Sequence, residues 1–243
     1  MPSPKKRTIS VGEQSYNSAK RPRQGGLLNY YTKKVASTSS VPDVYPKWTS
    51  IHENDLNISY AVIFHQKDVR FDYFKLLEEE VEYFSGELST VKLHGKSHNV
   101  PRKQSAYGDY GLVYKYSGVT YPAKPWTKTL SYLRKLVEDK SGYSFNFVLV
   151  NRYKDGDDRM GFHKDDEKDL IKEYPIASLS FGAERDFIFK HKDSDVDNVK
   201  LVLTDGMLLL MKHPTNSIWL HGLPKRKKCI FPRINLTFRR INT

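Results

Sequence analysis

Two stretches of the chain repeat apolar residues every three to four positions, which is the period of an amphipathic helix. The first covers residues 71–84 and should stop by Gly86. The second covers residues 126–137 and should stop at Gly142, because glycine is the usual residue just past the end of a helix. We therefore predict two helices, each with one apolar face to bury.

Beyond residue 144 the apolar period falls to two, or to short continuous apolar runs, which is typical of strands. Strands are expected at 145–150, 176–181, 187–189, 199–203, 207–211, 217–221 and 233–239. Helices do not alternate with these strands, so the pattern disfavours repeated β-α-β units. It predicts an α+β fold, mainly β, in which an antiparallel sandwich or barrel carries helices on its outside.

The last of these strands, RINLTFR, has one apolar and one polar face. The polar face carries Arg233, Asn235, Thr237 and Arg239. A sheet with one face in water could show this pattern. Two arginines beside an amide and a hydroxyl also form a donor-rich wall that suits a carboxylate ligand. Asn151 and Tyr153 similarly share one face at the end of the apolar run FNFVLV.

Composition limits the classes of protein that the chain can belong to. Its 243 residues suit one large domain or two small ones, and a hydrophobic content of 38% is enough for a core. No run approaches the ~18 apolar residues of a membrane span, so we expect no membrane partner. The single cysteine, Cys229, excludes an internal disulfide and makes a reducing compartment the default. A formal charge of +12 favours a polyanionic partner, with nucleic acid ahead of a membrane surface.

The positive charge is concentrated in residues 1–45, which carry eight Lys or Arg against Glu13 and Asp43. This tail is rich in Ser, Pro and Gly and has no sustained apolar period, so we expect it to be disordered. Basic clusters at 5–7 (KKR) and 20–23 (KRPR) resemble nuclear import signals and predict a nuclear protein. The alternative is a solvated electrostatic arm.

A second motif follows the KRPR cluster directly. In QGGLLNYY, Gln24, Leu27, Tyr30 and Tyr31 have the spacing of a box that binds the sliding clamp (proliferating cell nuclear antigen). One helical turn would present the leucine and the two tyrosines as a single apolar plug. The motif predicts the clamp as a partner, and the alternative is that the aromatic residues occur by chance in a polar tail.

The segment GFHKDDE places His163 two residues before Asp165. In an extended segment these side chains point to the same side. A single His-x-Asp is more often solvated than a metal site. However, His221 ends another predicted strand 58 residues later, and two histidines with one carboxylate on a β scaffold form the facial triad of non-haem iron(II) oxygenases.

The order of these residues, His-x-Asp, a distant His and then RINLTFR, resembles the AlkB family of iron(II) and 2-oxoglutarate dioxygenases. Other motifs from about residue 58 onward are similar to a family member that repairs alkylated bases in duplex DNA: PRKQSAYGD, NRYKDG, IASLSFGAERDF and HPTN. The resemblance implies that residues 46–243 form a dioxygenase domain with a double-stranded β-helix (jelly-roll) core. It also implies a nucleotide-recognition lid at about 88–122.

The resemblance assigns three sets of residues. Those that hold Fe(II) are His163, Asp165 and His221. Those that hold 2-oxoglutarate, the co-substrate with dioxygen, are Asn151, Tyr153, Arg233, Thr237 and Arg239. Those that contact the substrate are Leu93, His94, Gly95, Lys96, Arg102, Tyr114, Lys115, Tyr116, Asp166 and Glu167. In this scheme Tyr116 stacks on the flipped base opposite His163, and the two acids accept hydrogen bonds from the amino group of the base.

The reaction that the resemblance implies is oxidative demethylation of alkylated DNA bases, a direct reversal of damage. Its substrates are 1-methyladenine and 3-methylcytosine, with etheno adducts as further candidates, and its products are formaldehyde, succinate and CO2. The methyl group is inaccessible inside the base stack, so the base must be flipped out. We expect a monomer that acts on double-stranded DNA.

One part of the lid should insert a wedge between the two DNA strands, and its sequence differs from that of the family member that the chain matches. That member has Val-Phe-Gly where this chain has Leu93-His94-Gly95, and histidine is a smaller and more polar wedge than phenylalanine. The basic cluster at 225–228 (KRKK) is the expected phosphate contact. Three alternatives therefore stay open: the same chemistry on single-stranded DNA or RNA, a protein hydroxylase, and a non-catalytic DNA-binding adaptor recruited by the clamp.

Overall fold

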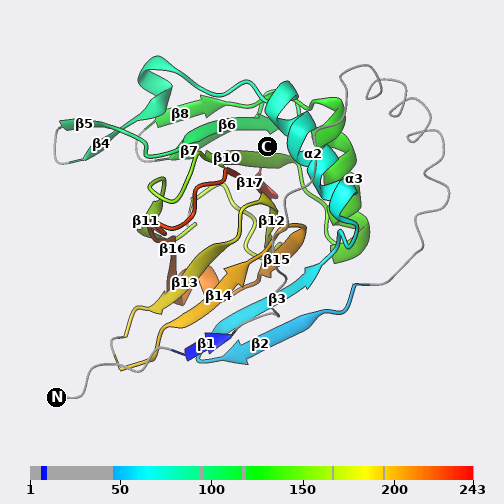
Figure 1. Cartoon of the computed structure of the whole chain (residues 1–243). Helices are drawn as coiled ribbons and strands as arrows, with labels where there is room; N and C mark the ends of the chain where they lie inside the picture. The colour runs from blue at the N-terminus through cyan, green and yellow to red at the C-terminus, as the bar shows by residue number, and fades with distance from the viewer. Residues whose placement is uncertain are drawn as a thin grey trace.

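The computed structural model of the chain describes residues 7–9, 46–93, 96–116, 119–165, 167–193 and 195–242. In this part, two larger β-sheets lie face to face, with helices on the outside of one of them (Figure 1). This is a jelly-roll core with external helices, as the sequence predicts. Residues 7–9 of the tail form a short strand that pairs with residues 199–201, so the expected disorder is wrong there, and the rest of residues 1–45 lies outside the described part of the chain.

The larger sheet has eight strands and supplies most of the framework. In spatial order they are β2 (Thr49–Glu53), β3 (Leu56–Val62), β15 (Met207–Met211), β12 (Ile176–Gly182), β17 (Arg233–Arg239), β10 (Phe147–Tyr153), β6 (Lys103–Gly108) and β9 (Lys124–Pro125). All neighbours are antiparallel except β6 and β9. The central strand β17 is therefore hydrogen-bonded on both sides, which fixes its side chains in place.

The smaller sheet has five strands and faces the larger one. In spatial order they are β1 (Arg7–Ile9), β14 (Val199–Leu203), β13 (Arg185–His191), β16 (Trp219–Leu223) and β11 (Met160–His163). Two further hairpins are not hydrogen-bonded into either sheet: β4 (Thr90–Leu93) with β5 (Lys96–Asn99), and β7 (Val113–Tyr116) with β8 (Val119–Pro122). The β7–β8 hairpin packs against the larger sheet through Tyr114 and Tyr121. Both hairpins belong to the expected lid, and the β4–β5 hairpin extends away from the body of the molecule (Figure 1).

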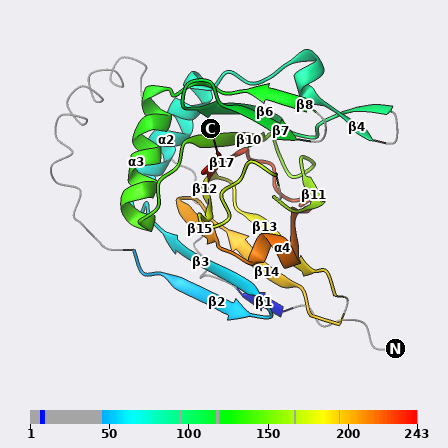
Figure 2. The ribbon, with the colours of Figure 1, turned by 180° about the vertical axis from the view of Figure 1, so that it is seen from behind.

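Two long helices, α2 (Lys67–Glu80) and α3 (Lys128–Ser141), cover the outer face of the larger sheet. The view from behind shows them side by side (Figure 2). A 3-10 turn, η2 (Gly86–Ser89), and a one-turn helix, α4 (Thr215–Ile218), complete the described elements. None of these helices has the length and apolar composition that crossing a membrane requires.

The ends of both long helices differ a little from the apolar pattern. α2 stops at Glu80, so Val81 and Phe84 pack against the core from the segment that follows it. α3 begins after Thr127, whose hydroxyl accepts a hydrogen bond from the Leu130 amide. It ends at Gly142 in the left-handed conformation, as predicted (φ 78°).

The predicted strands are all present, with shifts of a few residues at some ends. The largest difference lies before His221, where residues 215–218 form α4 and the strand starts only at Trp219. The apolar pattern missed the β2–β3 hairpin, which turns at Asn54 and Asp55, both with positive φ (48° and 63°). These two residue types accept such angles at hairpin turns.

Apolar side chains fill both sides of the larger sheet. On the helix side, Ile234, Leu236 and Phe238 of β17 join the core beneath α2 and α3. The opposite face of β17 therefore looks toward the smaller sheet. A second apolar cluster, which includes Phe187 and Trp219, fills part of that space. The remainder of it is lined by the polar residues of β17.

Candidate active site

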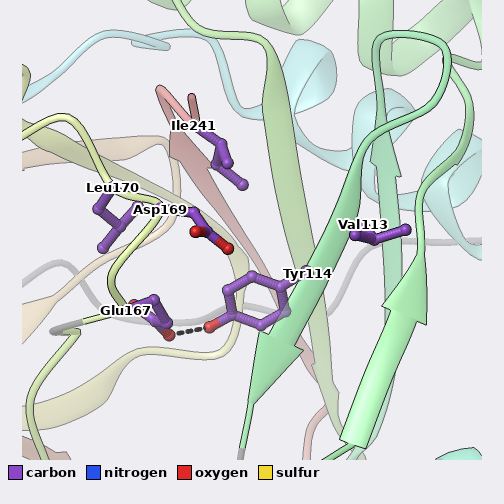
Figure 3. A pocket seen from close by; sticks show the side chains of 6 residues that line it. All are labelled: Val113, Tyr114, Glu167, Asp169, Leu170 and Ile241. Carbon is purple, nitrogen blue, oxygen red and sulfur yellow. Dashed lines mark hydrogen bonds between the residues drawn. The ribbon is translucent and has the colours of Figure 1, made fainter. Parts of the chain in front are cut away.

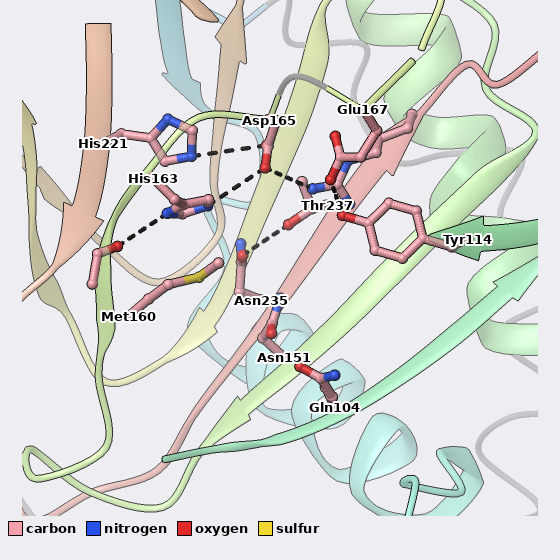
Figure 4. Close-up of polar contacts among 12 residues, drawn as sticks. Gln104, Tyr114, Asn151, Met160, His163, Asp165, Glu167, His221, Asn235 and Thr237 are labelled. Carbon is pink, nitrogen blue, oxygen red and sulfur yellow. Dashed lines mark hydrogen bonds and ion pairs between the residues drawn. The ribbon is translucent and has the colours of Figure 1, made fainter. Parts of the chain in front are cut away.

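Three side chains converge between the two sheets. His163 ends β11, Asp165 follows it, and His221 lies on β16, where it is the register partner of His163. The candidate ligand atoms of the three residues all lie within 4.8 Å of one another. The Nε2 atoms of His163 and His221 are 3.4 and 3.8 Å from the Asp165 carboxylate oxygens (Figure 4). This is the predicted triad, brought together by strand pairing.

The surroundings of the triad suit metal binding. His163 Nδ1 lies 3.0 Å from the Gly161 carbonyl oxygen, which can only accept, so Nδ1 donates there and Nε2 is the nitrogen that faces Asp165. Burial lowers the pKa of His221 to about 3. Burial opposes ionisation of Asp165, but Arg239 and the two histidines outweigh it and hold the pKa of this carboxyl well below its usual range.

A cavity adjoins the triad and is lined by the polar face of β17. Its polar walls come from Asn151, Tyr153, Ser178, Arg233, Asn235, Thr237 and Arg239, together with the triad. All five residues expected to hold 2-oxoglutarate are in this set. The sequence analysis did not assign Ser178 or Asn235, although Asn235 lies on the polar face that it recognised.

The hydrogen bonding of Arg233 and Arg239 indicates which kind of ligand this cavity can bind. Arg233 and Arg239 are 1% and 2% exposed, yet Nε and Nη1 of each have no hydrogen-bond partner in the described part of the chain. Buried donors of this kind need acceptors. Two guanidinium groups with free N–H groups fit a ligand with two carboxylates, so these residues fit 2-oxoglutarate.

Each arginine has a distinct position. Arg239 Nη2 is 3.1 Å from Asp165 Oδ1, and this pairing outweighs burial and raises the pKa of Arg239. Arg233 donates to the Ser180 hydroxyl at 3.0 Å and lies over the Tyr153 ring. Burial lowers the pKa of Arg233 to about 10, which leaves it charged at neutral pH. One arginine therefore lies beside the triad and the other beside Tyr153.

Two of the expected substrate residues meet on the other side of Arg239. Tyr114 is buried against Phe147, and its hydroxyl is hydrogen-bonded to the Glu167 carboxylate (Figure 3). The Arg239 guanidinium lies 5.1 Å from the centre of the Tyr114 ring. Burial raises the pKa of Glu167, with a further contribution from Asp165, although the charge of Arg239 opposes it. Tyr114 and Glu167 are thus connected to the triad through Arg239.

Arg102, another expected substrate residue, has partners within the chain. Its guanidinium donates to Asn151 Oδ1 at 2.7 Å and to Gln104 Oε1 at 3.3 Å. It therefore contacts a residue of the cavity. The sequence did not predict the contact with Asn151, because a contact across 49 residues leaves no local signal.

The other expected residues are only partly described. Leu93, Lys96, Lys115 and Tyr116 lie on the two lid hairpins, but the structure does not describe their side chains. Outside the described residues lie His94, Gly95, Asp166, Gln24, Leu27, Tyr30 and Tyr31.

Comparison with known proteins agrees with this geometry. The 2OG-Fe(II) oxygenase superfamily model matches residues 69–239. The DNA oxidative demethylase ALKBH2 of Bos taurus is 46% identical over 238 residues, covering 95% of this chain and 82% of that protein. The ALKBH2 protein of Homo sapiens is 51% identical over 203 residues, covering 81% and 77%. The solved structure of OsALKBH1 superposes with a TM-score of 0.55 and 18% identity, covering 79% of this chain and 100% of that one, and so supports the fold.

Proposed function

The chain belongs to the 2OG-Fe(II) oxygenase superfamily, and we propose that this dioxygenase is a DNA oxidative demethylase. One observation carries the proposal. A His-Asp-His triad lies beside two buried arginines with unpaired N–H groups, in a chain closely similar to DNA oxidative demethylases. The same observation disfavours the non-catalytic adaptor, because a vestigial site has no need to keep unpaired charges buried.

The residues of the chain would divide the work as follows. His163, Asp165 and His221 hold Fe(II). Bound iron and 2-oxoglutarate supply an oxidant from dioxygen, with release of succinate and CO2. The carboxylates of 2-oxoglutarate take up the free N–H groups of Arg233 and Arg239. The amide of Asn151 and the hydroxyls of Tyr153 and Thr237 supply further hydrogen bonds from the same cavity.

Tyr114 and Glu167 line a small cavity near Arg239, and we propose that a flipped base is bound on this side of the site. The Glu167 Oε2 atom is buried without a hydrogen-bond partner in the described part of the chain. An acceptor in this position favours a base that carries an exocyclic amino group. We therefore assign 1-methyladenine and 3-methylcytosine as substrates, with formaldehyde as the product from the methyl group. Etheno adducts are further candidates on the family resemblance alone, because their ring nitrogen has no hydrogen to donate to Glu167. Tyr116 and Asp166 complete the pocket in this proposal.

Duplex DNA is the substrate that we propose. In the sequence, His94 and Gly95 connect β4 to β5, and we propose that His94 fills the gap left by the flipped base. Lys96, Lys115 and the basic cluster at 225–228 would contact phosphates. Single-stranded DNA or RNA is the alternative substrate, because histidine is smaller and more polar than phenylalanine and fills the gap in a duplex less well.

The tail supports two further proposals, which rest on its sequence. We assign the basic clusters at 5–7 and 20–23 to nuclear import, and Gln24, Leu27, Tyr30 and Tyr31 to binding of the sliding clamp. In this scheme the clamp brings a monomeric enzyme to replicating DNA.

Formaldehyde release tests the central proposal. The full-length protein, supplied with Fe(II) and 2-oxoglutarate, should release formaldehyde from DNA that contains 1-methyladenine or 3-methylcytosine. His221→Ala, which lacks one metal ligand, is the matched inactive control. Matched duplex and single strands of one sequence decide between the two substrate forms. Succinate release without formaldehyde, on every methylated DNA tested, would reject DNA demethylation and leave the protein hydroxylase.

A further inference from the structure

Arg102 contacts Asn151, which is one of the residues that line the cavity. The side chain of Arg102 is half-buried, and its Nε donates to Asn151 Oδ1 at 2.7 Å. Its Nη2 donates to Oε1 of Gln104, a buried residue on β6. Asn151 is the register partner of both Gln104 on β6 and Asn235 on β17. Arg102 therefore bonds to side chains from two adjacent strands at the edge of the 2-oxoglutarate pocket.

The hydrogen bond from Arg102 determines which way the Asn151 amide is turned. An asparagine amide has an oxygen that accepts and a nitrogen that donates, and the two ends have nearly the same shape. A guanidinium can only donate, so only the oxygen can face Arg102. The Nδ2 group then lies on the side of Asn235 and the cavity (Figure 4). A donor on this side suits the keto or carboxylate oxygens of 2-oxoglutarate.

The backbone around Arg102 is held in place by hydrogen bonds on both sides. The Arg102 amide donates to the Val100 carbonyl at 2.8 Å, and the Val100 amide donates to the Ser89 carbonyl at 3.0 Å. The carbonyl of Pro101 accepts from the Arg159 amide at 3.2 Å. Arg102 thus comes from the base of the lid, three residues after the β4–β5 hairpin ends at Asn99.

We propose that Arg102 is a positioning residue for 2-oxoglutarate: it holds Asn151 Oδ1 and so directs Nδ2 at the co-substrate. This inference rests on the assignment of Asn151 to 2-oxoglutarate in the proposed function. It differs from the DNA contact that the family resemblance implies for Arg102. Without Arg102 the amide can turn over and present its oxygen to an anion, which weakens binding.

The test measures 2-oxoglutarate binding without DNA, where a pure DNA contact has no effect. 2-Oxoglutarate is titrated calorimetrically into the Mn(II)-loaded, full-length protein. Arg102→Ala should weaken binding about tenfold, the lower end of what losing an orienting partner behind a ligand costs at metal sites. Arg102→Lys retains a cation that only donates and should recover most of the affinity. The matched control is Lys103→Ala, because Lys103 is exposed and its ammonium lies over the Tyr83 ring, away from the cavity.

A double-mutant cycle shows whether Arg102 acts through Asn151. Asn151→Ala should weaken binding at least as much as Arg102→Ala, and the double variant should bind no more weakly than Asn151→Ala alone. Thermal unfolding of each variant excludes loss of fold as the cause. If Arg102→Ala does not fold, Arg102→Met, which keeps the aliphatic stem and removes the donors, carries the test and should weaken binding in the same way.

The possible results distinguish the role of Arg102 from the assignment of Asn151 to 2-oxoglutarate, on which it rests. Additive losses, or wild-type binding by Arg102→Ala together with weak binding by Asn151→Ala, would overturn the role of Arg102 and leave the proposed function intact. Wild-type binding by Asn151→Ala would instead remove Asn151 from the co-substrate site and the inference with it.

Discussion

At the scale of single residues, the active site is held together by charges that compensate one another. Asp165 is a candidate metal ligand and also the partner of Arg239. Arg239 in turn lies over the ring of Tyr114, whose hydroxyl is bonded to Glu167. One carboxylate therefore has two functions, because it completes the triad and neutralises the buried arginine beside it.

This double role predicts that the triad residues differ in their effect on stability. Asp165→Ala leaves Arg239 buried and unpaired, and removing one partner of a buried ion pair typically costs about 3–5 kcal/mol. Urea denaturation of the metal-free protein should show this loss. His221→Ala leaves the ion pair between Asp165 and Arg239 intact. It should therefore lower the free energy of unfolding by less.

The control for this prediction is a half-exposed ion pair. Asp186→Ala removes the partner of Lys200 at 2.9 Å, where a loss of about 0–1 kcal/mol is expected. A loss for Asp165→Ala that is as small as that of the control would mean that Arg239 finds another partner or solvent.

At the scale of elements, a third buried arginine fixes the loops around the site. Arg185 on β13 is fully buried and donates to the carbonyls of Asp155, Asp158 and Pro224 at 2.8–3.0 Å. These carbonyls belong to the loop after β10 and to the segment before the basic cluster at 225–228. The position of that cluster therefore depends on a residue that no solvent reaches.

Arg185→Met should consequently lower the free energy of unfolding by at least about 3 kcal/mol, because three charge-assisted hydrogen bonds are lost. Chemical denaturation measures this loss. Lys190→Ala, an exposed position on the same strand, should change stability by less than about 0.5 kcal/mol. Equal stability of the two variants would show that the loops are held without Arg185.

The β4–β5 hairpin gives a prediction about substrate form. If His94 fills the gap left by a flipped base, His94→Ala should lower formaldehyde release from methylated duplex DNA far more than from single strands, which have no gap to fill. His94→Phe should raise duplex activity, because the larger ring stacks better and has no polar edge to desolvate. Equal losses for His94→Ala on both substrates would make His94 an exposed residue of the hairpin tip.

At the scale of the whole molecule, the catalytic domain and the tail carry separable functions in our proposal. A peptide that spans residues 20–34 should bind the sliding clamp with a micromolar or smaller dissociation constant. Replacing Tyr30 and Tyr31 by alanine should abolish this binding, since aromatic anchors of an interface contribute roughly 2 kcal/mol or more each. Calorimetric titration of the two peptides into the clamp measures the difference.

The full-length double variant is the control for the clamp prediction. It should demethylate short free DNA at the rate of the parent protein, because the triad and the cavity are built from residues between 149 and 239. Clamp binding that survives both substitutions would reduce the tail to an electrostatic arm.

The sequence by itself determined the elements and most of the chemistry of the site. Alternating polarity in RINLTFR predicted both faces of β17, and the structure places Ile234 in the core and Arg233 in the cavity. The period of three to four predicted both helices, and Gly142 marked the end of one. Such patterns are readable because neighbours along a strand or helix have fixed relative directions.

Only the tertiary structure decided how distant residues share charges and hydrogen bonds. The pairs Arg239–Asp165 and Arg102–Asn151 join residues that are 74 and 49 positions apart, and no local period encodes them. Strand register brings the residues around these pairs together. Pairing of β11 with β16 places His163 opposite His221, and pairing of β10 with β6 places Asn151 opposite Gln104. The residue types therefore specified the chemistry of the site, whereas the pairing of the strands decided which atoms meet.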